Sequence, residues 1–148
     1  MCLPVAGETP AVGTRLTLTS WGRYLWHFHI PVYQKSLTAA VISNDDCASL
    51  YGEEMISPSV MCVSDGNWPK RVCSSDSGGP VYDQSGDVYI LAGILSPRSP
   101  GCRDMNEGAT FVNVLNFTQW ITDNVNRYSS GRQKFLPNRT ASNTNVSE

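Results

Sequence analysis

The residues around Ser77 have the clearest potential for chemistry in this chain. They read Cys73-Ser-Ser-Asp-Ser-Gly-Gly-Pro80. A serine hydroxyl is a poor nucleophile at neutral pH, so catalysis needs a histidine to accept its proton and a carboxylate to hold that histidine in the right tautomer. Neither partner is evident from the spacing of the residues near Ser77. The segment therefore indicates that Ser77 is a nucleophile, but the sequence does not show which histidine would act as its base.

The two histidines of the chain, His27 and His29, invite a functional interpretation. They lie two residues apart, so on a strand their side chains would share one face and could form a metal pair or supply a base. No carboxylate or cysteine lies near them in the sequence to complete a metal site. We interpret both as structural or surface residues, and we predict no metal and no cofactor.

The overall composition indicates one globular domain. The chain has 148 residues, of which 41% are hydrophobic and 16% charged, and a formal net charge of -2. No dense cluster of Lys and Arg suggests a phosphate-binding patch, so we expect neither nucleic acid nor membrane as a partner. No apolar run approaches the length of a membrane span, and the Cys-Leu-Pro that follows Met1 does not resemble a signal peptide.

The five cysteines indicate an oxidising compartment, because their spacing suits no zinc site. The odd number leaves one thiol whose partner lies elsewhere. Spacing alone does not say which cysteine this is. We therefore expect a secreted, extracellular protein.

Short apolar or alternating runs predict the strands of an antiparallel barrel. They cover Thr14–Thr19, Trp26–Ile30, Ser59–Val63, Val81–Tyr82, Val88–Ala92 and Thr110–Val114. The turn Gln84–Asp87 predicts a hairpin, and the run Val88–Ile94 predicts a strand buried on both faces.

An amphipathic helix is predicted over Asn116–Tyr128, because its apolar residues recur at helical spacing. Asn116 and Gln119 fit a capping box at its start. Residues 129–148 have too little apolar surface to offset the entropy of ordering them, which predicts a disordered tail.

The segment Cys73–Pro80 resembles the nucleophile segment of the chymotrypsin/trypsin-family serine proteases, usually written Gly-Asp-Ser-Gly-Gly-Pro. The similarity continues in an almost ungapped register from Cys2 to Tyr128. Thr19-Ser-Trp-Gly22 is similar to the family's Thr-Gly-Trp-Gly, and Gly93-Ile-Leu-Ser96 to its substrate-binding Gly-Ile-Val-Ser. The resemblance implies that residues 1–128 are the second half of a protease domain. Its fold would be all-β, a six-stranded antiparallel Greek-key barrel with a C-terminal α-helix.

The same resemblance assigns the cysteines. It pairs Cys47 with Cys62 around an intermediate helix, and Cys73 with Cys102 between the nucleophile loop and the far wall of the specificity pocket. Cys2 matches the cysteine that bonds back to the activation segment. It therefore implies a tether to an N-terminal barrel that these residues do not contain.

The resemblance also assigns roles around the nucleophile. Ser77 is the nucleophile, and its backbone N–H forms the oxyanion hole together with that of Ser75. Ser75 replaces the family's glycine, which costs about 1–3 kcal/mol of backbone strain or shifts the donor. Asp76 is the buried carboxylate that pairs with the amino terminus freed when a zymogen is cleaved. The catalytic histidine and aspartate belong to the missing barrel, and Asp45, Asp46 and Asp65 are interpreted as solvated loop acids.

The predicted substrate-binding residues are Arg71, Ser96 and Arg98. Arg71 matches the base of the specificity pocket, where it either selects an acidic side chain or folds inward and closes the pocket. Arg98 matches the pocket mouth, where Pro97 replaces the usual tryptophan and a side chain would narrow entry. The alternative is that both arginines are exposed loop residues.

Two functions follow from the resemblance. The first is a secreted serine endopeptidase that acts on a protein or peptide through a Ser77 acyl-enzyme. The second is a non-catalytic serine-protease homologue with a binding or regulatory role. In either case we expect the isolated chain to be inactive. In a secreted protein the sequons at Asn116, Asn138 and Asn145 would allow glycosylation.

Overall fold

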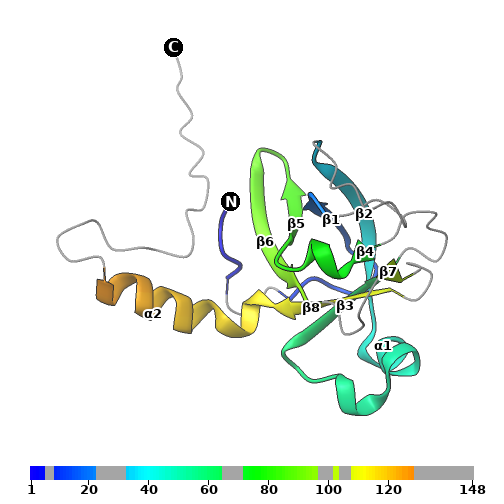
Figure 1. Cartoon of the computed structure of the whole chain (residues 1–148). Coiled ribbons are helices and arrows are strands. Elements are labelled where there is room, and N and C mark those ends of the chain that lie inside the picture. The colour runs from blue at the N-terminus through cyan, green and yellow to red at the C-terminus, as the bar shows by residue number, and fades with distance from the viewer. Residues whose placement is uncertain (6–8, 23–32, 65–71, 97–101, 104–107, 129–148) are drawn as a thin grey trace.

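Figure 1 shows the computed structural model, which describes residues 1–5, 9–22, 33–64, 72–96, 102–103 and 108–128. Its strands are β1 (Arg15–Ser20), β2 (Lys35–Ile42), β3 (Val60–Ser64), β4 (Val72–Cys73), β5 (Pro80–Ser85), β6 (Val88–Leu95), β7 (Cys102–Arg103) and β8 (Ala109–Asn113). Its helices are α1 (Asn44–Tyr51) and α2 (Thr118–Tyr128), with the 3₁₀ turns η1 (Glu53–Met55), η2 (Ser74–Asp76) and η4 (Val114–Phe117).

Six of the strands close into an antiparallel barrel in the order β1-β2-β3-β8-β6-β5. Thr17 and Leu18 of β1 pair with Tyr82 and Val81 of β5, which closes the ring. The strands β4 and β7 form a separate two-stranded ladder. The predicted fold class, a six-stranded antiparallel barrel followed by a C-terminal helix, is confirmed.

The barrel interior is filled by the inward-facing residues of alternating strands. In β1 burial alternates along the strand, so that Leu16 and Leu18 face the core while their neighbours do not. They pack with Val63, Val81 and Phe111 in one hydrophobic cluster. Alternation with a period of two is what a strand with one buried face requires, so the core follows from the sequence pattern.

Most of the predicted strands are confirmed with shifted ends, and the hairpin predicted at Gln84–Asp87 joins β5 to β6. The strand predicted at Trp26–Ile30 lies outside the described residues. The prediction that β6 is buried on both faces is wrong, because Tyr89 and Ile94 are each 39% exposed. Near both ends of β6, therefore, a side chain faces outward and only one side of the strand is buried.

The predicted capping box at Asn116 is also wrong. The C-terminal segment starts as the 3₁₀ turn η4, which is capped by the Asn113 side chain accepting from Leu115 N–H. Asn116 lies inside this turn, and its amide donates to the carbonyl of Pro58. Because Asn116 lies inside the 3₁₀ turn and the cap is Asn113, the cap of the C-terminal segment begins three residues earlier than predicted.

The helix α2 extends away from the barrel (Figure 1). Trp120 is 67% exposed and Tyr128 is 78% exposed, and Phe117 and Val125 are also exposed. The helical periodicity predicted from the sequence is therefore real, but nothing in the described part of the chain covers this face.

The first residues of the chain lie beside β6. The backbone N–H of Cys2 donates to Tyr89 O at 2.7 Å, and Leu91 N–H donates to Cys2 O at 2.9 Å. These two bonds make a parallel bridge between Cys2 and Ile90. The Cys2 thiol is free and partly exposed.

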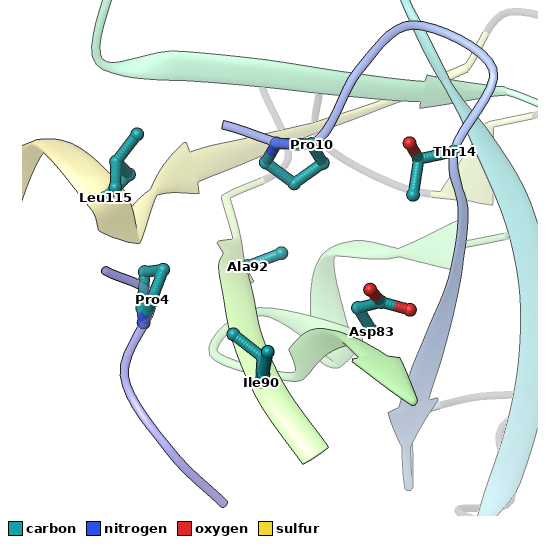
Figure 2. A pocket seen from close by; sticks show the side chains of 7 residues that line it. All are labelled: Pro4, Pro10, Thr14, Asp83, Ile90, Ala92 and Leu115. Carbon is teal, nitrogen blue, oxygen red and sulfur yellow. The ribbon is translucent and has the colours of Figure 1, made fainter. Parts of the chain in front are cut away.

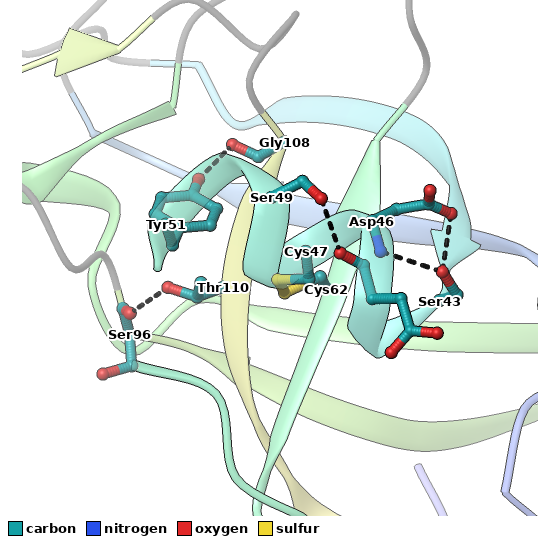
Figure 3. The surroundings of a disulfide bond; sticks show 10 residues. Ser43, Asp46, Cys47, Ser49, Tyr51, Cys62, Ser96, Gly108 and Thr110 are labelled. Carbon is teal, nitrogen blue, oxygen red and sulfur yellow. Dashed lines mark hydrogen bonds between the residues drawn. A yellow bond between two sulfur atoms is a disulfide. The ribbon is translucent and has the colours of Figure 1, made fainter. Parts of the chain in front are cut away.

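The helix α1 is fixed to the barrel by the disulfide Cys47–Cys62, which the resemblance predicted (Figure 3). The Ser43 hydroxyl accepts from Asp46 N–H at 3.0 Å and thereby caps the helix. At the other end Tyr51 donates to Gly108 O at 2.7 Å. A short helix with little burial of its own is thus held at both ends.

Removing this disulfide is expected to weaken the barrel. The bond closes a loop with a sequence separation of 15, and chain entropy predicts that Cys47→Ala/Cys62→Ala lowers the free energy of unfolding by about 3 kcal/mol. Urea denaturation measures this change. Cys2→Ala is the control, because it removes a free thiol and should leave the midpoint unchanged; an equal loss in both variants would contradict the prediction.

Candidate active site

Ser77 lies in a turn that crosses from β4 to β5. The turn passes through η2 and then through Gly78, whose φ of 83° is a conformation that glycine adopts without strain. Gly78 N–H donates to Leu95 O at 2.9 Å, and Leu95 N–H donates to Gly79 O at 2.9 Å. The end of β6 therefore holds the residues that follow Ser77.

The Ser77 side chain is exposed, as a nucleophile must be. Its hydroxyl donates to the carbonyl oxygen of Ser74 at 2.6 Å. Its backbone N–H donates to the same oxygen at 3.2 Å. In this conformation the Ser74 carbonyl binds both the hydroxyl and the amide of Ser77.

Asp76 is buried, with 3% of its surface exposed. Its Oδ2 accepts from Cys73 N–H at 2.8 Å, which closes η2. Its Oδ1 accepts from the Ser20 hydroxyl at 2.6 Å and lies 2.9 Å from Lys35 Nζ. Both carboxylate oxygens are thus bound, and one of their partners is a cation.

Gly22 covers the Asp76 carboxylate. A Cβ built on Gly22 would overlap Oδ1 and Cγ of Asp76 and would lie 2.8 Å from Asp76 N. The glycine of the Thr19-Ser-Trp-Gly22 segment is therefore required by the buried acid. Sequence reasoning recognised the segment but not this contact.

The substrate-binding prediction for Ser96 falls at the end of β6, next to the strand residues that hold the Ser77 turn. Ser96 N–H donates to Thr110 O at 3.0 Å, and the Thr110 hydroxyl donates back to Ser96 O at 2.7 Å. Ser96 is exposed. These bonds fix its backbone on β8 and leave its side chain open.

Several predicted site residues lie outside the described residues: Arg71, Pro97 and Arg98, the histidines His27 and His29, and Asp65. Ser75 is described and exposed, and it has bonding partners of its own. Its role in an oxyanion hole stays a prediction. Asp45 and Asp46 are exposed as predicted, but they lie in the first turn of α1 and not in a loop.

Cys73 is disulfide-bonded. Its backbone partner across the β4–β7 ladder is Cys102. Antiparallel partners bring their Cβ atoms close enough for a disulfide. The sulfur of Cys102 lies outside what the structure describes, so the pairing of these two cysteines stays a prediction.

A pocket of about 260 Å³ lies away from this turn, between the N-terminal segment, β1, the β5–β6 hairpin and η4 (Figure 2). Its lining is mostly apolar, and it includes Pro4, Ile90 and Leu115 with the carboxylate of Asp83. No residue of the Ser77 turn lines it. Within the described ranges, no group of three or more metal-ligating side chains is found, and no helix is long and apolar enough to cross a membrane.

Sequence reasoning missed Lys35 and Ser20 at this site. The two residues are opposite partners at the ends of β2 and β1. A strand prediction over Lys35–Ile42, paired in register with Arg15–Ser20, would have placed them together. The run Lys35–Ile42 was not recognised because its apolar residues do not alternate clearly at its start.

Comparison with known proteins supplies the wider context. The sequence model of the family described as Trypsin matches residues 1–121. The hepatocyte growth factor activator serine protease of Mus musculus is 30% identical over 130 residues, covering 84% of this chain and 19% of that protein. The serine proteinase stubble of Drosophila melanogaster is 30% identical over 130 residues, with 84% and 16% covered. Kallikrein-4 of Homo sapiens is 27% identical over 123 residues, with 83% and 46% covered. The chain thus spans less than half the length of each relative.

Proposed function

Because the chain belongs to the Trypsin family of serine proteases, we propose that it is the Ser77-bearing half of a serine endopeptidase. The observation that carries this proposal is that an exposed serine hydroxyl directly follows a buried, fully bound carboxylate in the chain. Ser77 faces outward, while Asp76 is fixed by three partners on the opposite side of the same turn. The turn therefore exposes the Ser77 side chain while it holds the preceding Asp76 side chain in place.

In the proposed reaction the Ser77 oxygen attacks the carbonyl carbon of a peptide bond. A histidine from an N-terminal barrel accepts the hydroxyl proton and later gives it to the leaving amine, while the acyl group stays on Ser77 until water removes it. The Ser77 hydroxyl must first leave the Ser74 carbonyl. Its N–H must leave the same oxygen before it can bind the developing oxyanion.

The missing barrel is the proposed partner of this chain. Two features support this partner. The apolar face of α2 leaves Trp120 and Tyr128 widely exposed, and the thiol of Cys2 is free. Burial of aromatic side chains stabilises such an interface, and a disulfide through Cys2 would tether the two halves. Secretion, activation by cleavage and glycosylation belong to the same proposal.

The substrate is proposed to be a protein or peptide. Arg71 would set the preference for the residue before the scissile bond, either by favouring an acidic side chain or by closing the pocket. Ser96 and Arg98 would border the same pocket. A library of peptides that differ only at this position, offered to the full-length protein, distinguishes selection of acidic residues from a closed pocket.

A fluorophosphonate tests the proposed nucleophile. In the full-length activated protein we expect the reagent to label Ser77, and we expect the coding sequence upstream of Met1 to contain a histidine motif such as Thr-Ala-Ala-His-Cys. The isolated 148-residue chain is expected to show no peptidase activity, because it lacks this base. An absent motif together with no labelling would contradict the enzyme and support the second function.

That second function is a non-catalytic homologue that binds partners through the same fold. The engagement of both Ser77 donors by Ser74 O supports it, as does Ser75 in place of the family's glycine. A substrate oxygen would have to compete with a bond already made inside the turn. Labelling of Ser77 decides between the two functions.

A further inference from the structure

The partners of Asp76 come from two neighbouring strands of the barrel. Ser20 is the last residue of β1, Lys35 is the first residue of β2, and the two are opposite each other in the antiparallel ladder. Both bind the same oxygen, Oδ1 of Asp76. The cation therefore reaches the carboxylate from a fixed position in the barrel wall.

Burial makes this ion pair important. The Asp76 side chain is 1% exposed and the Lys35 side chain 19% exposed. A carboxylate taken out of water needs a countercharge and hydrogen bonds at both oxygens, since an unpaired buried charge is strongly destabilising. Lys35, Ser20 and the Cys73 N–H together meet this need. The chain thus supplies the countercharge from its own sequence.

We propose that Lys35 is a positioning residue for Ser77: its ammonium is the built-in countercharge of Asp76 and holds the nucleophile turn in place without a cation from a cleaved amino terminus. This inference deepens the proposed function, since its catalytic consequence rests on Ser77 being the nucleophile. The ion pair itself does not depend on catalysis. It differs from the expectation that the resemblance implies, in which Asp76 acquires its partner only on activation.

Lys35 acts on Ser77 through Asp76. The Asp76 carboxylate accepts from Cys73 N–H on one side of the turn, and its backbone carbonyl accepts from Gly79 N–H at 3.0 Å on the other. Both flanks of Ser77 are therefore tied to one residue. If the carboxylate leaves its place, the turn loses the bond to Cys73 N–H, and Asp76 is no longer held against Ser20 and Lys35.

Unfolding in urea tests the ion pair on the 148-residue chain by a double-mutant cycle. Lys35→Met removes the charge and keeps a long side chain, and Asp76→Asn removes the charge that it faces. We expect Lys35→Met to lower the equilibrium constant for folding by at least about tenfold, or roughly 1.4 kcal/mol. In the Asp76→Asn background the same change is expected to have little effect. Equal losses in both backgrounds would overturn the inference.

Lys35→Arg is the matched variant, because it keeps the charge on a long side chain. It should retain most of the stability that Lys35→Met loses. If Lys35→Met does not fold by itself, recovery of folding in Lys35→Met/Asp76→Asn shows the coupling, because the second change removes the carboxylate left without a countercharge; failure to recover would overturn the inference. If Lys35→Arg loses as much unfolding free energy as Lys35→Met, the charge is not what Lys35 contributes.

Labelling of Ser77 by a fluorophosphonate in the uncleaved full-length protein is the second readout. If Lys35 positions Ser77, then Lys35→Met should slow labelling of Ser77 by at least about tenfold, and Lys35→Arg should keep the wild-type labelling rate. A labelling rate that is the same in Lys35→Met and in wild type would overturn the inference, even if the proposed enzyme activity is correct. If wild type does not label before or after cleavage, the proposed function fails, and the urea cycle alone then decides whether Lys35 pairs with Asp76.

Discussion

Ser77→Ala in the full-length activated protein is expected to abolish peptidase activity, with kcat lowered by about 10⁵–10⁶-fold. The loss is this large because the hydroxyl is the only atom that can form the acyl-enzyme, and without it the histidine of the other barrel has no nucleophile to deprotonate. Turnover of a peptide substrate, normalised to the concentration of folded protein, measures the effect. The barrel should be unaffected, since Ser77 is exposed.

Ser74→Ala is the matched control for this prediction. It removes a hydroxyl from an exposed serine in the same turn but keeps the backbone carbonyl that binds Ser77. Its activity should stay within about tenfold of wild type, as expected for a surface change that leaves the nucleophile in place. Activity that survives Ser77→Ala would show that another residue is the nucleophile.

Gly22→Ala is expected to lower the free energy of unfolding by about 3–5 kcal/mol, since the new methyl group and the Asp76 carboxylate cannot occupy the same space. The built Cβ overlaps Oδ1 and Cγ of Asp76, and the nearby Asp76 backbone nitrogen prevents a simple rotation. Moving the carboxylate away breaks its bonds to Ser20 and Lys35. The expected result is loss of the buried ion pair, measured by urea denaturation.

Gly86→Ala separates this steric effect from the ordinary cost of replacing glycine. Gly86 lies in the β5–β6 turn with φ of 61°, and a Cβ built there meets no atom within 4 Å. Its replacement should cost roughly 1–2 kcal/mol, from the left-handed backbone alone. A smaller loss for Gly22→Ala than for Gly86→Ala would show that the carboxylate can move aside freely.

The sequence predicted those parts of the fold that depend on local pattern or on family motifs. The alternating run Thr14–Thr19 predicted strand β1, the turn before Val88 predicted the hairpin, and the resemblance predicted the Cys47–Cys62 disulfide. Each of these signals lies within a short window or in a recognised motif. They were sufficient to predict the barrel.

Contacts between distant residues could not be predicted in the same way. The bond between Lys35 and Asp76 forms because β1 and β2 pair in one register and the Ser77 turn folds back onto their ends. The binding of both Ser77 donors by Ser74 O depends on the 3₁₀ geometry of η2. Both results depend on tertiary packing, for which residue types along the chain give no direct signal.

The bridge at Cys2 has a consequence for the solubility of the chain. On the side of β6 away from β5, β8 pairs only with Gly93–Leu95, and the Cys2 backbone binds Tyr89 O and Leu91 N–H. A strand edge with open donors and acceptors is a template for pairing with a second molecule. Cys2 therefore covers part of the β6 edge and protects it from aggregation. A chain that lacks Met1 and Cys2, and so begins at Leu3, would expose this edge.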